Sequence, residues 1–176
     1  HSHVTGCASV ERGIMADNTA APAGPDTQAA PKAGQPTAIR VLAQYIKDFS
    51  FENPGTARAQ QQPNIDLGID VGATPHKDGQ NMFEVSLRMQ AKASASDTTL
   101  FILELDYAGL YQFDTSDQNV LEPLLLIECP RILFPFARRI ISDITRDGGF
   151  PPLLVDPIDF VGLYRGQKQK AADASS

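Results

Sequence analysis

Two neighbouring stretches of the chain alternate apolar and polar residues one by one. NIDLGIDV (64–71) has Ile, Leu or Val at every odd position and Asp or Gly between them. MFEVSLRMQAKA (82–93) continues the alternation, with apolar residues at positions 83, 85, 87, 89 and 91. A period of two gives a strand one buried face and one wet face, which is typical of antiparallel sheets. The alternation therefore predicts a sheet that is covered on one face.

Two further stretches are strand-like. YIKDFSFE (45–52) places its aromatic residues on one side, and TLFILELDYAGLY (99–111) places large apolar residues at odd positions. The other side of 99–111 mixes Leu100 and Ile102 with Glu104 and Asp106, which is too apolar for a solvent face. We expect that side to be half covered by another subunit or a partner. The Asp-Gly pair of HKDGQN (76–81) and the short SASD (94–97) predict that hairpins join most of the strands.

Beyond Phe113 the apolar period becomes helical. TSDQNVLEPLLLIE (115–128) begins with capping residues, and a second helix carries an apolar stripe at 132, 133, 136, 137, 140, 141 and 144 before Gly148-Gly149 ends it. FPPLLVDPIDF (150–160) is expected to be extended, and IDFVGLYRGQ (158–167) to form a short last helix. This order predicts an α+β fold, a four-stranded antiparallel sheet with two main helices packed on one side.

The two ends differ from the middle in composition. Residues 1–37 are rich in Ala, Pro, Gly, Thr and Gln and are expected to be a disordered tail, with 1–14 preceding a natural start at Met15. The folded domain is expected over 38–166, and a flexible tail over 167–176. Cys7 and Cys129 provide no disulfide framework, which favours a reduced, cytoplasmic protein. No apolar run approaches the roughly 20 residues that span a bilayer, so no membrane insertion is expected.

Charge and residue types narrow the function. A net charge of -6 argues against nucleic acid as a partner and favours basic ones. His76 stands in a turn, and Cys129 has no CxxC partner, so an inert core thiol is expected rather than redox chemistry. An enzyme that uses strand carboxylates on a small molecule stays open as a remote alternative. The pattern favours a non-enzymatic protein that binds other proteins through apolar patches, without metal or cofactor.

Three motifs, in their order along the chain, carry a resemblance to a known family. KDFSFENP (47–54), YAGLYQF (107–113) and LLLIECPRILFPFARRIISDITRDGGFPPLLVDPIDF (124–160) closely resemble SecB, the bacterial protein-export chaperone. The resemblance covers residues 40–165. It implies a homotetramer, a dimer of dimers. It also implies an ATP-independent holdase that keeps precursor proteins unfolded and delivers them to the SecA motor. A chaperone of the same fold dedicated to one antitoxin of a toxin–antitoxin module is the alternative.

The resemblance also implies roles for particular residues. The resemblance implies that Asp48, Glu52, Ile102 and Glu104 contact SecA. The zinc of this contact belongs to the tail of SecA, so no metal is expected in this chain. It also implies that Leu103, Leu105 and Tyr107 take part in tetramer assembly. We expect the groove for unfolded chains to use aromatic residues near the junction of sheet and helices, namely Tyr45, Phe49, Tyr111, Phe113 and Phe134.

Overall fold

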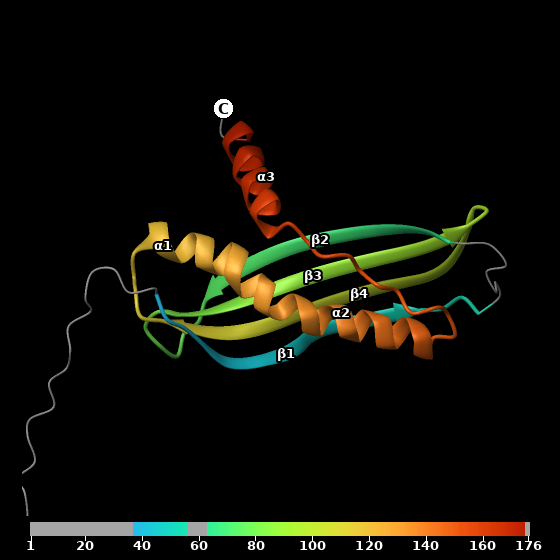
Figure 1. Ribbon diagram of the computed structural model, residues 1–176, viewed down its shortest axis with the longest axis horizontal. Helices are drawn as coiled ribbons and strands as arrows, with labels where there is room; N and C mark the ends of the chain where they lie inside the picture. The colour runs from blue at the N-terminus through green and yellow to red at the C-terminus, as the bar shows by residue number, and fades with distance from the viewer. Residues whose placement is uncertain (1–36, 56–62, 175–176) are drawn as a thin grey trace, which may run out of the picture. The chain divides into compact units, whose positions relative to one another are not determined.

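The alternating stretches form one four-stranded antiparallel sheet in the computed structural model, which describes residues 37–55 and 63–174. The strands are β1 (Ile39–Glu52), β2 (Asn64–Pro75), β3 (Met82–Ala95) and β4 (Thr98–Phe113). Their order across the sheet is β1-β4-β3-β2, so hairpins join β2 to β3 and β3 to β4 (Figure 1). The connection from β1 to β2 instead links the two edge strands of the sheet. Apart from position 37, the expected tail over 1–37 lies outside the described residues.

The two hairpin turns reach left-handed backbone without glycine. Ser96 and Asp97 form a two-residue turn between β3 and β4 with φ of 48° and 65°, the geometry that matches the twist of paired strands. Between β2 and β3 the left-handed residue is Asn81, with φ of 56°. The Asp-Gly signal therefore located this turn, but Gly79 is not the residue with positive φ.

The buried face of the sheet is made by odd-numbered residues of β3 and β4. Leu87 of β3 lies directly opposite Tyr107, and Met89 lies opposite Leu105. Residues that face each other across an antiparallel pair point to the same side, and these side chains are buried. Leu100 is an exception to the expected alternation. The register passes from Ala93–Phe101 to Ser94–Thr99, which skips Leu100, and its side chain joins the core instead of the polar face.

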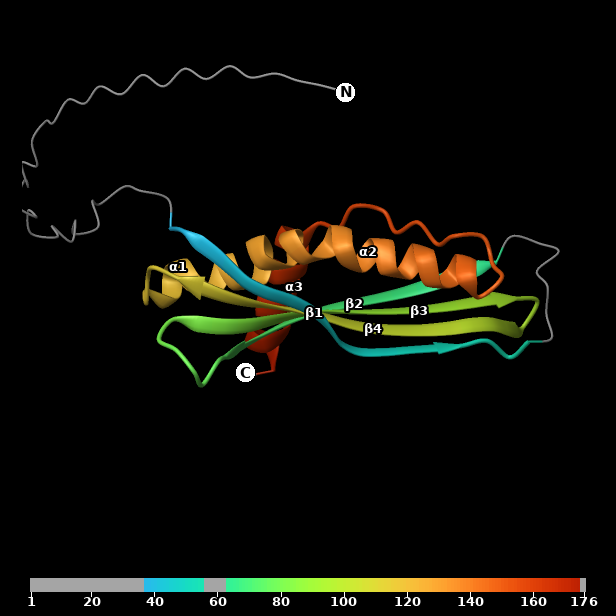
Figure 2. The ribbon, with the colours of Figure 1, turned by 90° about the horizontal axis from the view of Figure 1, so that it is seen from below.

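The two expected helices follow each other without a loop. They comprise α1 (Gln118–Pro123), the π-helical turn η1 (Leu124–Glu128) and α2 (Cys129–Asp147). Asp117 caps the start, as expected, because its side chain accepts the N–H of Asn119 at 3.0 Å. The N–H of Cys129 bonds to the carbonyl of Leu124, the five-residue spacing of a π turn. Together these elements cover one face of the sheet, as Figure 2 shows.

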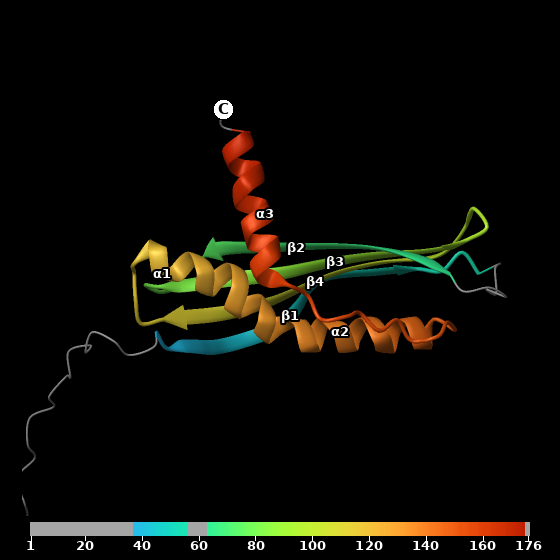
Figure 3. The ribbon, with the colours of Figure 1, turned by 45° about the horizontal axis from the view of Figure 1, so that its top comes forward.

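Gly148 and Gly149 end α2, and Gly149 takes the left-handed φ of 89°. The chain then returns along α2, on the side of β2, as an extended segment, Phe150 to Ile158, which we call the strap (Figure 1). The last helix, α3 (Phe160–Asp173), begins at the cap residue Asp159 and rises past β2 (Figure 3). Residues 167–173, expected in a flexible tail, are thus helical. A bond between Gln167 and Asp70 of β2, at 3.2 Å, helps to hold them.

Candidate functional site

The face of the sheet opposite α2 gathers the four residues that the resemblance linked to SecA. Glu52 lies directly opposite Ile102, and Ser50 lies opposite Glu104, so β1 and β4 bring both pairs together. Asp48 lies two residues from Ser50 on the same face, opposite Asp106. We call Asp48, Glu52, Ile102 and Glu104 the acidic patch.

A cationic side chain beside the acidic patch is paired with carboxylates outside the patch. The guanidinium of Arg88 on β3 donates from Nε to Asp106 Oδ2 at 3.2 Å, and its Nη1 lies 4.0 Å from Asp70 Oδ2. Within the described part of the chain, no ion pair reaches the carboxylates of Asp48, Glu52 or Glu104. A shallow hollow of about 100 Å³ opens beside them, lined by Asp48, Arg88, Gln90, Glu104 and Asp106 among others. Its lining holds three carboxylates and one guanidinium, so a negative excess remains and favours a further cationic side chain.

Tyr45 also lies on the polar face of the sheet. Its hydroxyl donates to Glu84, whose carboxylate also accepts a hydrogen bond from the Lys47 ammonium. The Lys47 bond, followed by the Tyr45 bond, lowers the pKa of Glu84. The bond to Glu84 in turn raises the pKa of Tyr45 to about 12. Tyr45 is therefore committed to a polar contact, and the structure does not place it beside the other expected groove aromatics.

On the helix-covered face, the apolar stripe of α2 divides into two rows. Leu133, Ala137 and Ile141 are buried against the sheet. The second row is turned toward β1 and is only partly covered; it comprises Ile132, Phe136, Ile140 and Ile144. Phe136 is 47% exposed and stacks on Tyr107 with ring centroids 6.3 Å apart. A hollow of about 320 Å³ lies beside these two rings.

Strand β1 continues this apolar surface. Ile46 lies opposite Tyr107 and Phe49 lies opposite Leu105, so both point to the helix side, and Ile46 is 50% exposed. We call Val41, Ile46, Phe49 and the second row of α2 the β1-side surface. Among the described strands, β1 pairs only with β4, so its outer edge is open. Exposed apolar side chains beside an open strand edge are typical of a surface that another chain covers.

A second apolar surface lies on the opposite side of α2. Leu154 of the strap is 64% exposed, and Leu67 of β2, opposite Ala91, is exposed on the same helix side. Ile65 and Ile69 of β2 and Leu153 of the strap are half-buried. We call these five residues the strap-side surface. Unlike the β1-side surface, it includes a segment with neither helix nor strand.

The remaining expected residues lie inside the chain. Leu103, Leu105 and Tyr107, expected in tetramer assembly, are buried within the chain's own core. Tyr111, Phe113 and Phe134 are also buried, and Phe134 packs edge-on against Phe160 at 6.1 Å. Of the five expected groove aromatics, only Phe49 is exposed on the helix side. Sequence reasoning missed Phe136, although it stood in the stripe, and Leu154, for which no periodic signal exists.

Cys129 carries no sign of reactivity. The thiol is buried, and burial raises its pKa to about 12, so it stays protonated near neutral pH. Its backbone carbonyl accepts the hydroxyl of Tyr111 at 3.3 Å. Among residues 37–55 and 63–174, no three His, Cys, Asp or Glu side chains are grouped as metal ligands. Cys129 is therefore a buried residue that packs at the start of α2, as the sequence indicated.

A sheet with a helix on one face, exposed apolar side chains beside that helix, and an acidic patch on the other face define a polypeptide-binding protein. The family model described as preprotein translocase subunit SecB matches residues 32–171. The chain belongs to the SecB family, a family of protein-export chaperones that bind unfolded proteins and not a family of enzymes.

Relatives and a solved structure agree with this assignment. The protein-export protein SecB of Hyphomonas neptunium is 64% identical over 84% of this chain and 93% of its own length. That of Maricaulis maris is 54% identical over 86% of this chain and 89% of its own length. A SecB-like chaperone of Mycobacterium tuberculosis, solved with a ChAD peptide from the HigA1 antitoxin, shares the fold. Its TM-score is 0.60 at 14% identity, over 69% of this chain and 91% of that one.

Among residues 37–55 and 63–174, none of the helices has the length and apolar character that a membrane span requires.

Proposed function

We propose that the chain acts in the cytoplasm as an ATP-independent holdase that receives unfolded precursor proteins and transfers them to SecA. The observation that carries this proposal is the separation of two kinds of surface. Exposed apolar residues lie on the helix side of the sheet, and the acidic patch lies on the opposite face. A client and a basic partner can then be bound at the same time, which a transfer between them requires.

The client is held on the strap-side surface. An unfolded precursor offers apolar segments of many sequences, so its binding site needs area and adaptable side chains more than a fixed set of hydrogen bonds. Leu154 and Leu67 supply exposed apolar area on an extended segment and on a strand. No nucleotide and no cofactor enter this step, because transfer to a partner that hydrolyses ATP can drive release.

Assembly uses the β1-side surface. A second copy that packs on Phe136 and Ile46 and pairs with the open edge of β1 covers both features at once. This contact closes at a dimer, so a homotetramer, a dimer of dimers, needs a second interface between two such pairs. Leu103, Leu105 and Tyr107 contribute indirectly, because they pack in the core beneath α2 and support the row that contains Phe136.

The acidic patch receives SecA. Glu104, Glu52 and Asp48 present uncompensated carboxylates to a basic segment, and Ile102 adds an apolar contact between them. Charge complementarity of this kind raises the association rate and selects against acidic competitors. The zinc of the partner's tail stays with the partner, so the patch needs no metal of its own.

Binding of SecA to the wild type and to Glu104→Lys, measured by titration calorimetry, tests this assignment. Asp66→Lys is the matched control, because Asp66 is an exposed carboxylate of the same face on the far strand β2. We expect Glu104→Lys to lose most of the binding and Asp66→Lys to lose little. Undiminished binding by Glu104→Lys would remove the acidic patch from the proposal.

A chaperone dedicated to one antitoxin is the second candidate. The mycobacterial SecB-like chaperone was solved with an antitoxin peptide, but at 14% identity its likeness to this chain concerns the fold alone. The relatives at 54–64% identity are named protein-export proteins, and we therefore place export first. Protection of several unrelated unfolded proteins distinguishes the two, because a dedicated chaperone protects one client. We propose no reaction for the strand carboxylates.

A further inference from the structure

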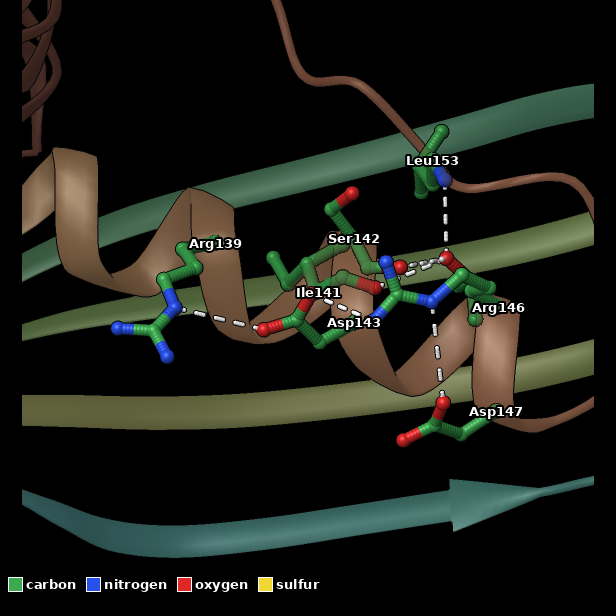
Figure 4. A network of polar contacts seen from close by, with 8 residues as sticks. Arg139, Ile141, Ser142, Asp143, Arg146, Asp147 and Leu153 are labelled. Atoms are coloured by element: carbon green, nitrogen blue, oxygen red, sulfur yellow. Dashed lines mark hydrogen bonds and ion pairs between the residues drawn. The ribbon is translucent and has the colours of Figure 1, made fainter.

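One buried residue of α2 ties the strap to the helix twice. The Thr145 hydroxyl donates toward the carbonyl oxygens of Ile141 and Ser142, at 2.9 and 3.1 Å, and accepts the N–H of Leu153 at 2.9 Å (Figure 4). The backbone carbonyl of Thr145 accepts the N–H of Phe150 at 3.0 Å. Both ends of the Phe150–Leu153 segment are thus bonded to the same residue.

A threonine hydroxyl that bonds back to the preceding turn is common in helices and has no functional meaning by itself. The Thr145 hydroxyl oxygen also accepts the N–H of Leu153, which lies outside the helix. This second bond goes beyond the common pattern. Pro151 and Pro152 stand between the two bonded residues and have no N–H of their own. Their fixed φ angles keep this part of the strap stiff, so a shift at Leu153 is passed to its neighbours.

The hydrogen bond from the Leu153 N–H to the Thr145 hydroxyl therefore determines which side chain of the strap is exposed to solvent. Leu153 is half-buried, Val155 is buried in the core, and Leu154 between them is 64% exposed. Neighbouring side chains of an extended segment point to opposite sides. Holding the Leu153 N–H on α2 turns Leu154 outward, where it forms part of the strap-side surface.

We propose that Thr145 is the positioning residue of the strap-side surface, and that its hydroxyl sets how long an apolar segment of an unfolded polypeptide stays bound. This inference rests on the proposed holdase function. Without the hydroxyl, the Leu153 N–H loses its acceptor, and the strap opens from α2 around Leu153 more often, although the Phe150 bond and the buried Val155 remain. Leu154 then holds its outward position for a smaller share of the time.

The test uses the full chain with Thr145→Val, which keeps the shape of the side chain without its hydroxyl, and Thr145→Ser, which keeps the hydroxyl. Ser142→Ala is the control, because it removes a hydroxyl one turn away that is not bonded to the strap. We expect the Leu153 amide to exchange with deuterium about ten-fold faster in Thr145→Val, in proportion to one buried hydrogen bond. We expect exchange near the wild-type rate in the other two variants. Unchanged protection in Thr145→Val would overturn the inference.

The second readout is the dissociation rate of a fluorescently labelled, permanently unfolded protein. We expect this rate to rise several-fold in Thr145→Val and to stay near the wild-type value in Thr145→Ser and Ser142→Ala. A faster amide exchange with an unchanged dissociation rate also overturns the positioning role. If Thr145→Val does not fold, Thr145→Ala removes the same hydroxyl, leaves Leu153 and its amide in place, and is compared with the wild type by the same two readouts. If the wild type itself holds no unfolded protein, the proposed function fails, while the amide exchange still reports on the strap.

Discussion

Asp48 lies directly opposite Asp106 across the β1–β4 pair. Two carboxylates in facing positions repel each other, and the Arg88 guanidinium is bonded to Asp106 rather than to Asp48. Arg88 thus offsets the charge of Asp106, while the Asp48 carboxylate has no ion pair among the described residues. A basic partner that binds this face explains why the carboxylate is useful there.

Asp48→Asn should separate stability from binding. Removing one of the facing charges should leave the free energy of unfolding unchanged or raise it by about 0.5 kcal/mol, while SecA binds several-fold more weakly. Urea unfolding and calorimetry measure the two quantities. Asp66→Asn, on the same face but on β2, is the control for a general loss of negative charge. Equal weakening by both variants would contradict a localised acidic patch.

Phe136→Asp should break the assembly without unfolding the chain. The ring is 47% exposed in the single chain, so a charge there costs little in the monomer. In the proposed assembly the same charge would be buried against a second copy, which is costly. Light scattering should show a mass below four chains. Leu154→Asp, an equivalent change on the strap-side surface, should keep the wild-type mass and bind unfolded protein more weakly. The account is wrong about the two surfaces if their effects are exchanged.

Leu103→Ala should act on the fold itself. Leu103 is fully buried within the chain, and truncation of such a leucine costs about 2–5 kcal/mol of unfolding free energy. We expect a lower unfolding midpoint, with any loss of tetramer following the loss of structure. A variant of wild-type stability that no longer assembles would show instead that Leu103 contacts another subunit directly.

The Cys129 thiol should be inert in the folded protein. Because burial raises its pKa to about 12, almost no thiolate exists at pH 8, and reagents also cannot reach the sulfur. In a Cys7→Ser background, Ellman's reagent should react with Cys129 only after urea unfolds the chain. Rapid reaction in the native state would refute the buried position.

Glu84 should contribute to the loss of stability in acid. Bonds from Lys47 and Tyr45 lower its folded pKa from 4.5, so the folded state holds the proton less tightly than the unfolded state. The stabilisation is present above pH 4.5 and is lost as the pH falls through the folded pKa. Glu84→Gln should show a flatter decline of unfolding free energy below pH 4.5 than the wild type. An identical decline in both proteins would show that the bonds to Glu84 are not formed in solution.

The strands and their buried face could be predicted because alternation is a local property. Val85, Leu87 and Met89 are buried as the period of two indicated. The order of the strands could not be predicted, since pairing of β1 with β4 depends on residues far apart in sequence. Leu100 was misplaced for a related reason, because the skipped register that turns it to the core is set by the partner strand.

The helical stripe was also predictable, but its division into two rows was not. Periodicity counts apolar positions without saying what covers them, so Phe136 and Leu133 look alike in sequence and differ in the fold. The end of α3 gives no apolar signal at all. Its polar residues are held by tertiary contacts, including an ion pair between Lys168 and Glu122 at 3.2 Å.

Suppression of aggregation tests the central claim most directly. A chemically unfolded protein is diluted into buffer without ATP, and light scattering follows its aggregation with and without the full chain. With one tetramer present for each unfolded chain, scattering should stay near the baseline. Scattering that rises as fast as in the absence of the chain would contradict the account.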